Sequence, residues 1–334
     1  MEAADRSTDG SAGCATAILA CLALSTAYVA SLYVWSTSQS REHPSTIKKR
    51  FFSVFVMTFV SPAPLYFVLN NREFQQATIW EMLGLRWTGL VQATVIPLVL
   101  TMILFLGPLS LQGFSGLWRL YTEPMYWLIS VQTLTWWRNQ VVAPLSEEWT
   151  FRACMLPLLL QCFTPTTAIF VCPLFFGIAH FHHIVERVKM GVSLKHALLI
   201  SCFQSAYTTL FGAYAAFLFV RTGGIIFTSF SYFRYICEVS TKFFVINFFF
   251  FFFNKFQFMF VLLGHFIAPF AAHSFCNHMG FPDLSEIAAY KDPLQRVGLI
   301  CLFVIGLIAW CLLLMPMTHP SLFNNNLFWT KYFI

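Results

Sequence analysis

Two adjacent carboxylates lie in an otherwise apolar stretch, residues 144–157, whose sequence is PLSEEWTFRACMLP. On a helix, Glu148 and Arg152 are four residues apart on one face, so they can form an ion pair. Glu147 points about 100° away and is left without that partner. An unpaired carboxylate in a low-dielectric site is a stronger base than one in water, which suits a general base near neutral pH. A purely structural lock between helices would need one acid per base, not two.

Three histidines end a second apolar segment, FFGIAHFHH, which closes at residue 183. His180 and His183 share a helix face, whereas His182 points elsewhere. Both His182 and His183 fit an interfacial position at the membrane boundary. His180 lies deepest, one turn after Phe176, and is expected to belong to a functional site.

A third polar group occurs in the segment HSFCNHMGFP, near the C-terminal end of the chain. His273 and Asn277 are one helical turn apart and can both donate hydrogen bonds to one small target. Such a pair suits an oxyanion site, where the loss of one donor costs about 10²–10³ in rate. The alternative is a hydrogen bond between helices of a bundle, and His278, on another face, is expected to be structural. A base, a histidine and an oxyanion pair together indicate an intramembrane hydrolase.

The composition indicates that membrane-spanning helices position these groups. The chain has 334 residues, of which 58% are hydrophobic and 10% charged, and its mean hydropathy is +0.68. Soluble domains carry roughly a quarter charged residues. Clustered basic patches with exposed aromatics, which a nucleic-acid-binding protein would need, do not occur, so we expect no nucleic-acid partner.

The fold class is therefore predicted to be all-α, a multi-pass transmembrane helical bundle of about eight spans. A polar residue at membrane depth is costly and usually faces a cavity where it functions, so the bundle is expected to enclose a catalytic cavity. Apolar stretches long enough to cross lie near 14–35, 51–69, 90–110, 126–143, 145–162, 166–181, 197–219, 262–278 and 297–315.

The first span is expected to be a retained anchor, because it exceeds the length of a cleaved signal sequence and no basic region precedes it. It is followed by SREHPSTIKKR, which is rich in Lys and Arg. The positive-inside rule therefore places residues 36–50 in the cytosol and the N-terminus on the far side. We predict an N-terminal tail over 1–13, one membrane-embedded domain over 14–318 and a C-terminal tail over 319–334.

The ten cysteines lack metal-binding CxxC spacing and the framework of a small secreted domain. Most lie in apolar stretches and are expected to be buried free thiols. They include Cys14, Cys21, Cys172, Cys202, Cys301 and Cys311.

The motif set E-E-x-x-x-R, F-x-x-x-H and H-x-x-x-N resembles that of the CAAX prenyl endopeptidases of the Ras-converting type. The three motifs read EEWTFR from 147, FGIAH from 176 and HSFCN from 273, and the likeness covers roughly residues 40 to 315. The resemblance implies a helical bundle of eight spans in the endoplasmic reticulum membrane, with a conical cavity open to the cytosol. It implies removal of the aaX tripeptide from farnesylated or geranylgeranylated CAAX proteins such as Ras-like small GTPases, without a cofactor.

The same resemblance implies a role for each matched residue. Glu147 and His180 would activate the attacking water, and His273 and Asn277 would stabilise the tetrahedral oxyanion. The site would be supported by Glu148 and Arg152. Burial of the prenyl chain in the membrane lipid, at about 0.8 kcal/mol per CH₂, would hold the substrate locally.

The chain departs from that pattern over 41 residues, 224–264, of which 14 are Phe. Without them Gly223 would join His265 as RTGHFIAPF, which reads as a continuous family motif. We interpret the segment as an insertion, with a translated intron as its hypothesised origin. A single extra crossing there would reverse every later span, so an active enzyme requires the segment to cross zero or two times, or to be absent.

Two other readings of the sequence stay open. A zinc protease could use Glu147, His180 and His273 as ligands, although no HExxH motif is present. The second is a transporter or a catalytically inactive scaffold. Transporters usually contain internal repeats, and none is apparent in this sequence.

Overall fold

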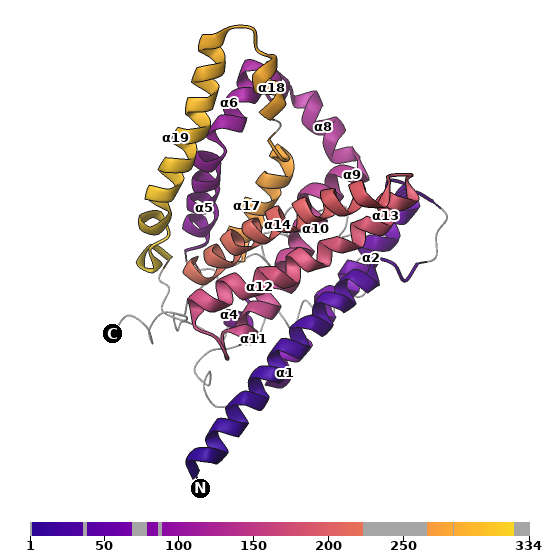
Figure 1. Ribbon diagram of the computed structural model, residues 1–334, viewed down its shortest axis with the longest axis vertical. Coiled ribbons are helices and arrows are strands. Elements are labelled where there is room, and N and C mark those ends of the chain that lie inside the picture. The colour runs from indigo at the N-terminus through magenta and orange to yellow at the C-terminus, as the bar shows by residue number, and fades with distance from the viewer. Residues whose placement is uncertain are drawn as a thin grey trace.

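The computed structural model describes residues 2–35, 39–68, 79–85, 89–222, 266–282 and 284–323. Within these ranges every regular element is helical, so the predicted all-α membrane class is confirmed (Figure 1). The predicted insertion, residues 224–264, lies outside the described residues.

Fewer helices than predicted are long and apolar enough to cross a membrane. The described residues contain four such helices, or five if a pair bent by 69° counts as one span. The prediction of about eight spans is therefore not confirmed. The four are Gly13–Ser31 within α1 (Glu2–Ser31), Pro44–Phe67 across α2 (Pro44–Val60) and α3 (Ala63–Val68), Pro165–Lys189 and Pro293–Met317, and the bent pair is α5 (Leu90–Leu104) with α6 (Leu106–Phe114).

The remaining helices are shorter or more polar. Helix α14 has 29 residues, long enough to cross at 1.5 Å per residue, but carries many hydroxyl and amide side chains. The other elements of the first half are α4 (Ile79–Met82), α7 (Leu117–Tyr121), α8 (Pro124–Gln132), α9 (Leu134–Trp137), η2 (Arg138–Val142), α10 (Ala143–Glu148), η3 (Trp149–Met155) and α11 (Leu156–Leu159). Those of the second half are α12 (Pro165–Ala179), η4 (His180–His182), α13 (His183–Lys189), α14 (Leu194–Thr222), α17 (Ile267–Met279), α18 (Leu284–Ala289), α19 (Pro293–Met317) and η5 (Pro320–Phe323).

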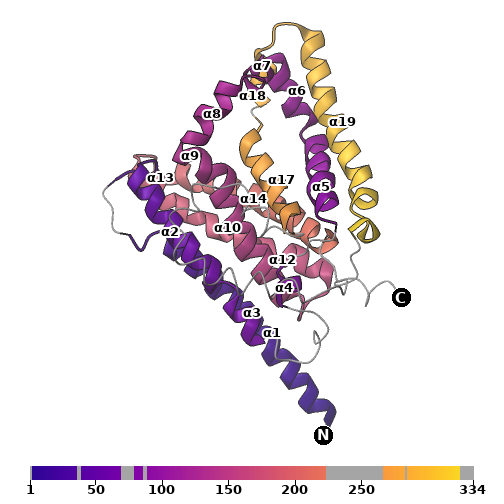
Figure 2. The same cartoon turned by 180° about the vertical axis from the view of Figure 1, so that it is seen from behind.

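The helices enclose α10 from several sides. Helices α5, α6 and α19 form one flank of the molecule, and α1 and α2 form the opposite flank (Figures 1 and 2). Between them α12 packs along α14, while α10 contacts both α2 and α17. The element that carries the two glutamates thus lies at the meeting point of helices from both halves of the chain.

Helices α12 and α14 approach closely at a glycine. A Cβ atom on Gly177 would lie 2.0 Å from Oγ1 of Thr209 and 3.0 Å from the carbonyl oxygen of Ser205. The hydroxyl of Ser205 donates to the carbonyl of Gly177 at 2.9 Å. Small residues and interhelical hydrogen bonds of this kind are how membrane helices pack against each other.

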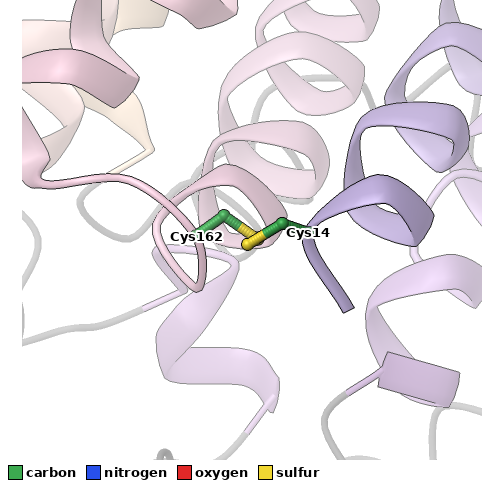
Figure 3. The surroundings of a disulfide bond; sticks show 2 residues. All are labelled: Cys14 and Cys162. Atoms are coloured by element: carbon green, nitrogen blue, oxygen red, sulfur yellow. A yellow bond between two sulfur atoms is a disulfide. The ribbon is translucent and has the colours of Figure 1, made fainter. Parts of the chain in front are cut away.

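The prediction of free, buried thiols was wrong for four of the six cysteines named for it. Cys14 on α1 forms a disulfide with Cys162, which lies in the turn before α12 (Figure 3). Cys21 and Cys172 are buried free thiols as expected. Cys202, Cys301 and Cys311 are exposed free thiols, so their expected burial was wrong.

Candidate active site

The two glutamates lie on a short α-helix between two π-helical segments, η2 before it and η3 after it. Pro144 accounts for the first irregularity, because it has no N–H to donate to the carbonyl of residue 140. The N–H of Ala143 bonds instead to the carbonyl of Arg138, five residues back. Short π segments inside helices occur frequently at functional sites.

The carbonyl groups released by Pro144 bind side chains of α17. The carbonyl of Gln140 accepts a hydrogen bond from Ser274 Oγ at 2.8 Å. That of Asn139 accepts one from Nδ2 of Asn277 at 2.9 Å. The irregular backbone before α10 therefore accepts two hydrogen bonds that hold α17 against this segment.

Glu148 forms the buried centre of the site. Its Oε1 accepts from Nη1 of Arg152 at 3.0 Å, which is the predicted pair of residues four apart. The same oxygen lies 2.6 Å from Nδ1 of His273, from a helix 125 positions later in the chain. Both Glu148 and Arg152 are fully buried. A carboxylate shared in this way fixes the orientation of the imidazole ring.

Arg152 is enclosed on its other sides by apolar groups. Its guanidinium carbon lies 4.3 Å from the centre of the Phe176 ring, within the range of a cation–π contact. A Cβ atom on Gly212 of α14 would come within 2.8 Å of Nη2. Within the described residues, Nε and Nη2 of Arg152 have no hydrogen-bond partner. The carboxylate of Glu148 therefore compensates the charge of the buried Arg152 guanidinium. Loss of that carboxylate would strongly destabilise the folded protein.

Glu147 faces the other nitrogen of the same imidazole ring, that of His273. Its Oε2 lies 3.7 Å from Nε2 of His273. The Glu147 side chain is 21% exposed, whereas that of Glu148 is 0% exposed. Of the two neighbouring acids, only Glu147 is open to a water molecule or a substrate.

His180 contacts the ring of Phe176, which also lies near His273. Its Nδ1 lies 2.8 Å from the carbonyl oxygen of Phe176, and because a carbonyl only accepts, Nδ1 carries the hydrogen. The other nitrogen of the neutral ring is then free to accept a proton. The ring of Phe176 has its centre 4.7 Å from that of His180 and 6.2 Å from that of His273. The two imidazoles therefore flank one phenylalanine.

Asn277 is the least enclosed of the predicted site residues. It follows His273 by one turn of α17 and is exposed. One N–H of its amide is engaged by the carbonyl of Asn139, and the amide has a second N–H to donate. This anchoring bond was not predicted from the sequence, although the missing N–H of Pro144 indicates a free carbonyl nearby.

The three other histidines of the motif segments have structural contacts. Nδ1 of His182 lies 2.5 Å from the carbonyl of Ala179, and that of His183 lies 3.2 Å from Oε2 of Glu186. His278 packs against aromatic rings, with centres 5.3 Å from Tyr121 and 6.0 Å from Trp127.

The alternative hypothesis of a zinc protease requires a group of metal-binding side chains. In the ranges that the structure covers, no three His, Cys, Asp or Glu side chains are grouped as a metal ion would require.

Comparisons with a family model and with curated proteins point to the same family. A family model described as type II CAAX prenyl endopeptidase Rce1-like matches residues 129–233, which include the glutamate pair and the first histidine motif. The chain is 38% identical over 321 residues to CAAX prenyl protease 2 of Homo sapiens, covering 93% of this chain and 84% of the human protein.

Two further relatives with the same name extend the match. That of Rattus norvegicus is 33% identical over 320 residues, covering 93% of this chain and 83% of the rat protein. The Arabidopsis thaliana protein is 31% identical over 343 residues, covering 96% and 95%. No solved structure matches the chain. With this similarity over nearly its whole length, and with all three motifs of the family in place, the chain belongs to the type II CAAX prenyl endopeptidase family of membrane proteases.

Proposed function

We propose that the protein is an intramembrane endopeptidase that removes the aaX tripeptide from isoprenylated CAAX proteins. The observation that carries the proposal is the position of Glu147, 3.7 Å from His273 and partly exposed, beside a fully buried Glu148–Arg152 pair. The names of the relatives support the substrate class. Farnesylated and geranylgeranylated proteins, including Ras-like small GTPases, are the proposed substrates.

The geometry supports a division of roles between the two acids. Glu147, assisted by the free nitrogen of His180, takes a proton from water as the water oxygen attacks the carbonyl carbon of the prenylated cysteine. The proton is then delivered to the departing amine of the tripeptide. Removal of such a base lowers the rate by about 10²–10⁴-fold.

His273 and Asn277 are proposed to stabilise the negative oxygen of the tetrahedral intermediate. With Nδ1 of His273 donating to Glu148, a protonated ring presents its Nε2–H on the open side of the site. Asn277 presents its second amide N–H. Donors held in place before the reaction stabilise the developing charge most effectively.

The reaction is proposed to need no metal, and chelation tests this directly. Enzyme dialysed against a strong zinc chelator should retain its full rate, with no zinc found by elemental analysis. A loss of activity that zinc alone restores would instead assign residues 147, 180 and 273 to a metal site.

The protein is proposed to reside in the endoplasmic reticulum membrane with its active site reached from the cytosol. The basic segment that follows α1 supports a cytosolic position for residues 36–50. The disulfide supports the same orientation, because Cys14 lies toward the opposite end of α1 from that segment, and disulfides persist in the oxidising lumen. In sealed microsomes, a membrane-impermeant thiol reagent applied from the cytosolic side should therefore leave Cys14 and Cys162 unmodified after mild reduction.

The activity itself is tested with a fluorogenic peptide in detergent or vesicles. A farnesylated Cys-a-a-X peptide should release its tripeptide, and the same peptide without the farnesyl group should not. The assay is performed on the full chain and on a variant lacking residues 224–264, because the predicted insertion separates the elements that carry the site. Failure of both proteins to cleave the farnesylated peptide would contradict the proposed function.

A further inference from the structure

Arg138, the first residue of η2, forms a connected set of contacts at the edge of the site. Its Nε donates to Oδ1 of Asn139 at 2.9 Å, and its Nη2 pairs with Oε2 of Glu42 at 3.0 Å. The Arg138 side chain is 17% exposed, while that of Glu42 is 54% exposed. A mostly enclosed cation therefore faces a mostly exposed carboxylate from the loop before α2.

Arg138 is linked to the proposed oxyanion site through a single residue. Asn139 accepts from Arg138 on its side-chain oxygen and from Asn277 on its backbone oxygen. Two hydrogen bonds of about 3 Å and one short residue limit the separation of the two outer groups to on the order of 10 Å. Three extended residues of a peptide span about 10 Å. The guanidinium thus lies within about one tripeptide length, on the order of 10 Å, of the amide of Asn277.

From these distances we propose that Arg138 binds the free C-terminal carboxylate of the substrate and so sets the cleavage point three residues from the end. The inference rests on the proposed function, since it names a specificity determinant of that same reaction. A free carboxylate near the membrane is costly without a cation, and a guanidinium binds carboxylates with two parallel hydrogen bonds.

Other cations near the site are occupied by different partners. Arg152 is fully buried against Glu148. Arg50 pairs with Glu186 at 2.9 Å. Arg138, whose carboxylate partner is an exposed loop residue, is the best suited of the three to exchange that carboxylate for one of a substrate.

Glu42 occupies the position that the substrate carboxylate takes. Burial by itself would raise the pKa of Glu42, but the hydrogen bond and charge of Arg138 and the charge of Arg41 lower it overall. Glu42 is therefore ionised at neutral pH and competes with the substrate for Arg138. An ion pair with one exposed partner contributes little to stability, so the incoming carboxylate displaces Glu42 at little cost.

The test uses two farnesylated peptides that differ only at the C-terminus, one a carboxylate and the other a carboxamide. A hydrogen-bonded charge contributes about 1.5–3 kcal/mol, so the wild-type enzyme should prefer the carboxylate by about 10–100-fold in kcat/KM. In Arg138→Gln the preference should fall to less than about threefold. The fall should come from a lower kcat/KM for the carboxylate peptide, with that for the carboxamide peptide unchanged. Glu42→Gln should have the opposite effect and lower KM for the carboxylate peptide several-fold.

Control variants separate this role from a structural one. Arg119→Gln, at an exposed arginine on α7, should leave the preference unchanged, and Arg138→Lys should retain part of it. If Arg138→Gln lowers kcat/KM equally for both peptides, or if Glu42→Gln and Arg138→Gln impair the enzyme alike, the carboxylate role is contradicted. Wild-type enzyme that cleaves neither peptide contradicts the proposed function, whereas equal cleavage of both contradicts the carboxylate site alone.

Discussion

Nδ1 of His273 lies 2.6 Å from Oε1 of Glu148, the oxygen that also accepts from Arg152. One carboxylate thereby joins α17 to the helical run that carries the glutamates. It orients the imidazole ring through Nδ1 and compensates the guanidinium at the same time. The second acid of the motif is explained by this double contact, while Glu147 is left for chemistry.

Glu148→Gln is expected to destabilise the protein as well as slow it. The amide leaves Arg152 as a buried cation without a counter-charge, which costs about 3–5 kcal/mol. Thermal unfolding in detergent should shift to lower temperature, and kcat should fall less than in Glu147→Gln. Glu123→Gln, at an exposed glutamate, is the control and should change neither. An unaltered melting temperature in Glu148→Gln would show that Glu148 does not compensate the arginine.

Gly212→Ala is expected to disturb the same arginine from the opposite side. The added methyl carbon would lie 2.8 Å from Nη2 of Arg152 and 2.9 Å from Cβ of Pro173. Overpacking of this kind costs about 1–3 kcal/mol, and both stability and activity should decrease. Gly298→Ala in α19 is the matched control, because no atom lies within 4 Å of its added carbon. That change should be neutral or stabilising by up to about 1 kcal/mol; equal loss in the two variants would contradict the packing argument.

Asn277→Ala separates the oxyanion role from the anchoring role. Loss of an oxyanion donor lowers kcat by about 10²–10³ with little change in KM. The control is Ser274→Ala, which removes the parallel anchor to the carbonyl of Gln140 but no proposed oxyanion donor. It should cost about tenfold or less, as expected for one net hydrogen bond of about 1 kcal/mol. Equal losses in the two variants would leave Asn277 with an anchoring role only.

Some of the site could be predicted from local spacing and some could not. The Glu148–Arg152 pair follows from a separation of four residues on a helix, and the all-helical class follows from composition. The contact between Glu148 and His273 depends on how α17 packs, which no local pattern specifies. The position of Phe176 between two imidazoles is a consequence of packing in the same way.

The irregular helices explain why the described residues contain fewer straight spans than apolar length predicts. Apolar length predicts straight crossings, but α5 and α6 meet at a 69° bend. Thr133 is extended, with φ −90° and ψ 135°, and ends α8 inside a stretch predicted as one span. Protein contacts around the site support such breaks, because they satisfy the backbone groups that lipid could not.

The Cys14–Cys162 disulfide is expected to add stability, and its presence can be tested by counting free thiols. A bridge between residues 148 positions apart stabilises by about 2–5 kcal/mol in proteins that form it. Cys14→Ser should therefore unfold at a lower temperature than wild type. Under denaturing, non-reducing conditions it should take up one more maleimide label than wild type, because Cys162 becomes free. One label fewer would mean that Cys14 is unpaired in the wild-type protein.

The most direct measurement is single-turnover release of the tripeptide by Glu147→Gln, beside His180→Ala and His273→Ala, with unfolding temperatures recorded for each. The account predicts that Glu147→Gln folds as the wild type does and binds the farnesylated peptide, but cleaves it at least about 10²-fold more slowly. Wild-type rates in the folded Glu147→Gln protein would contradict the assignment of Glu147 as the base.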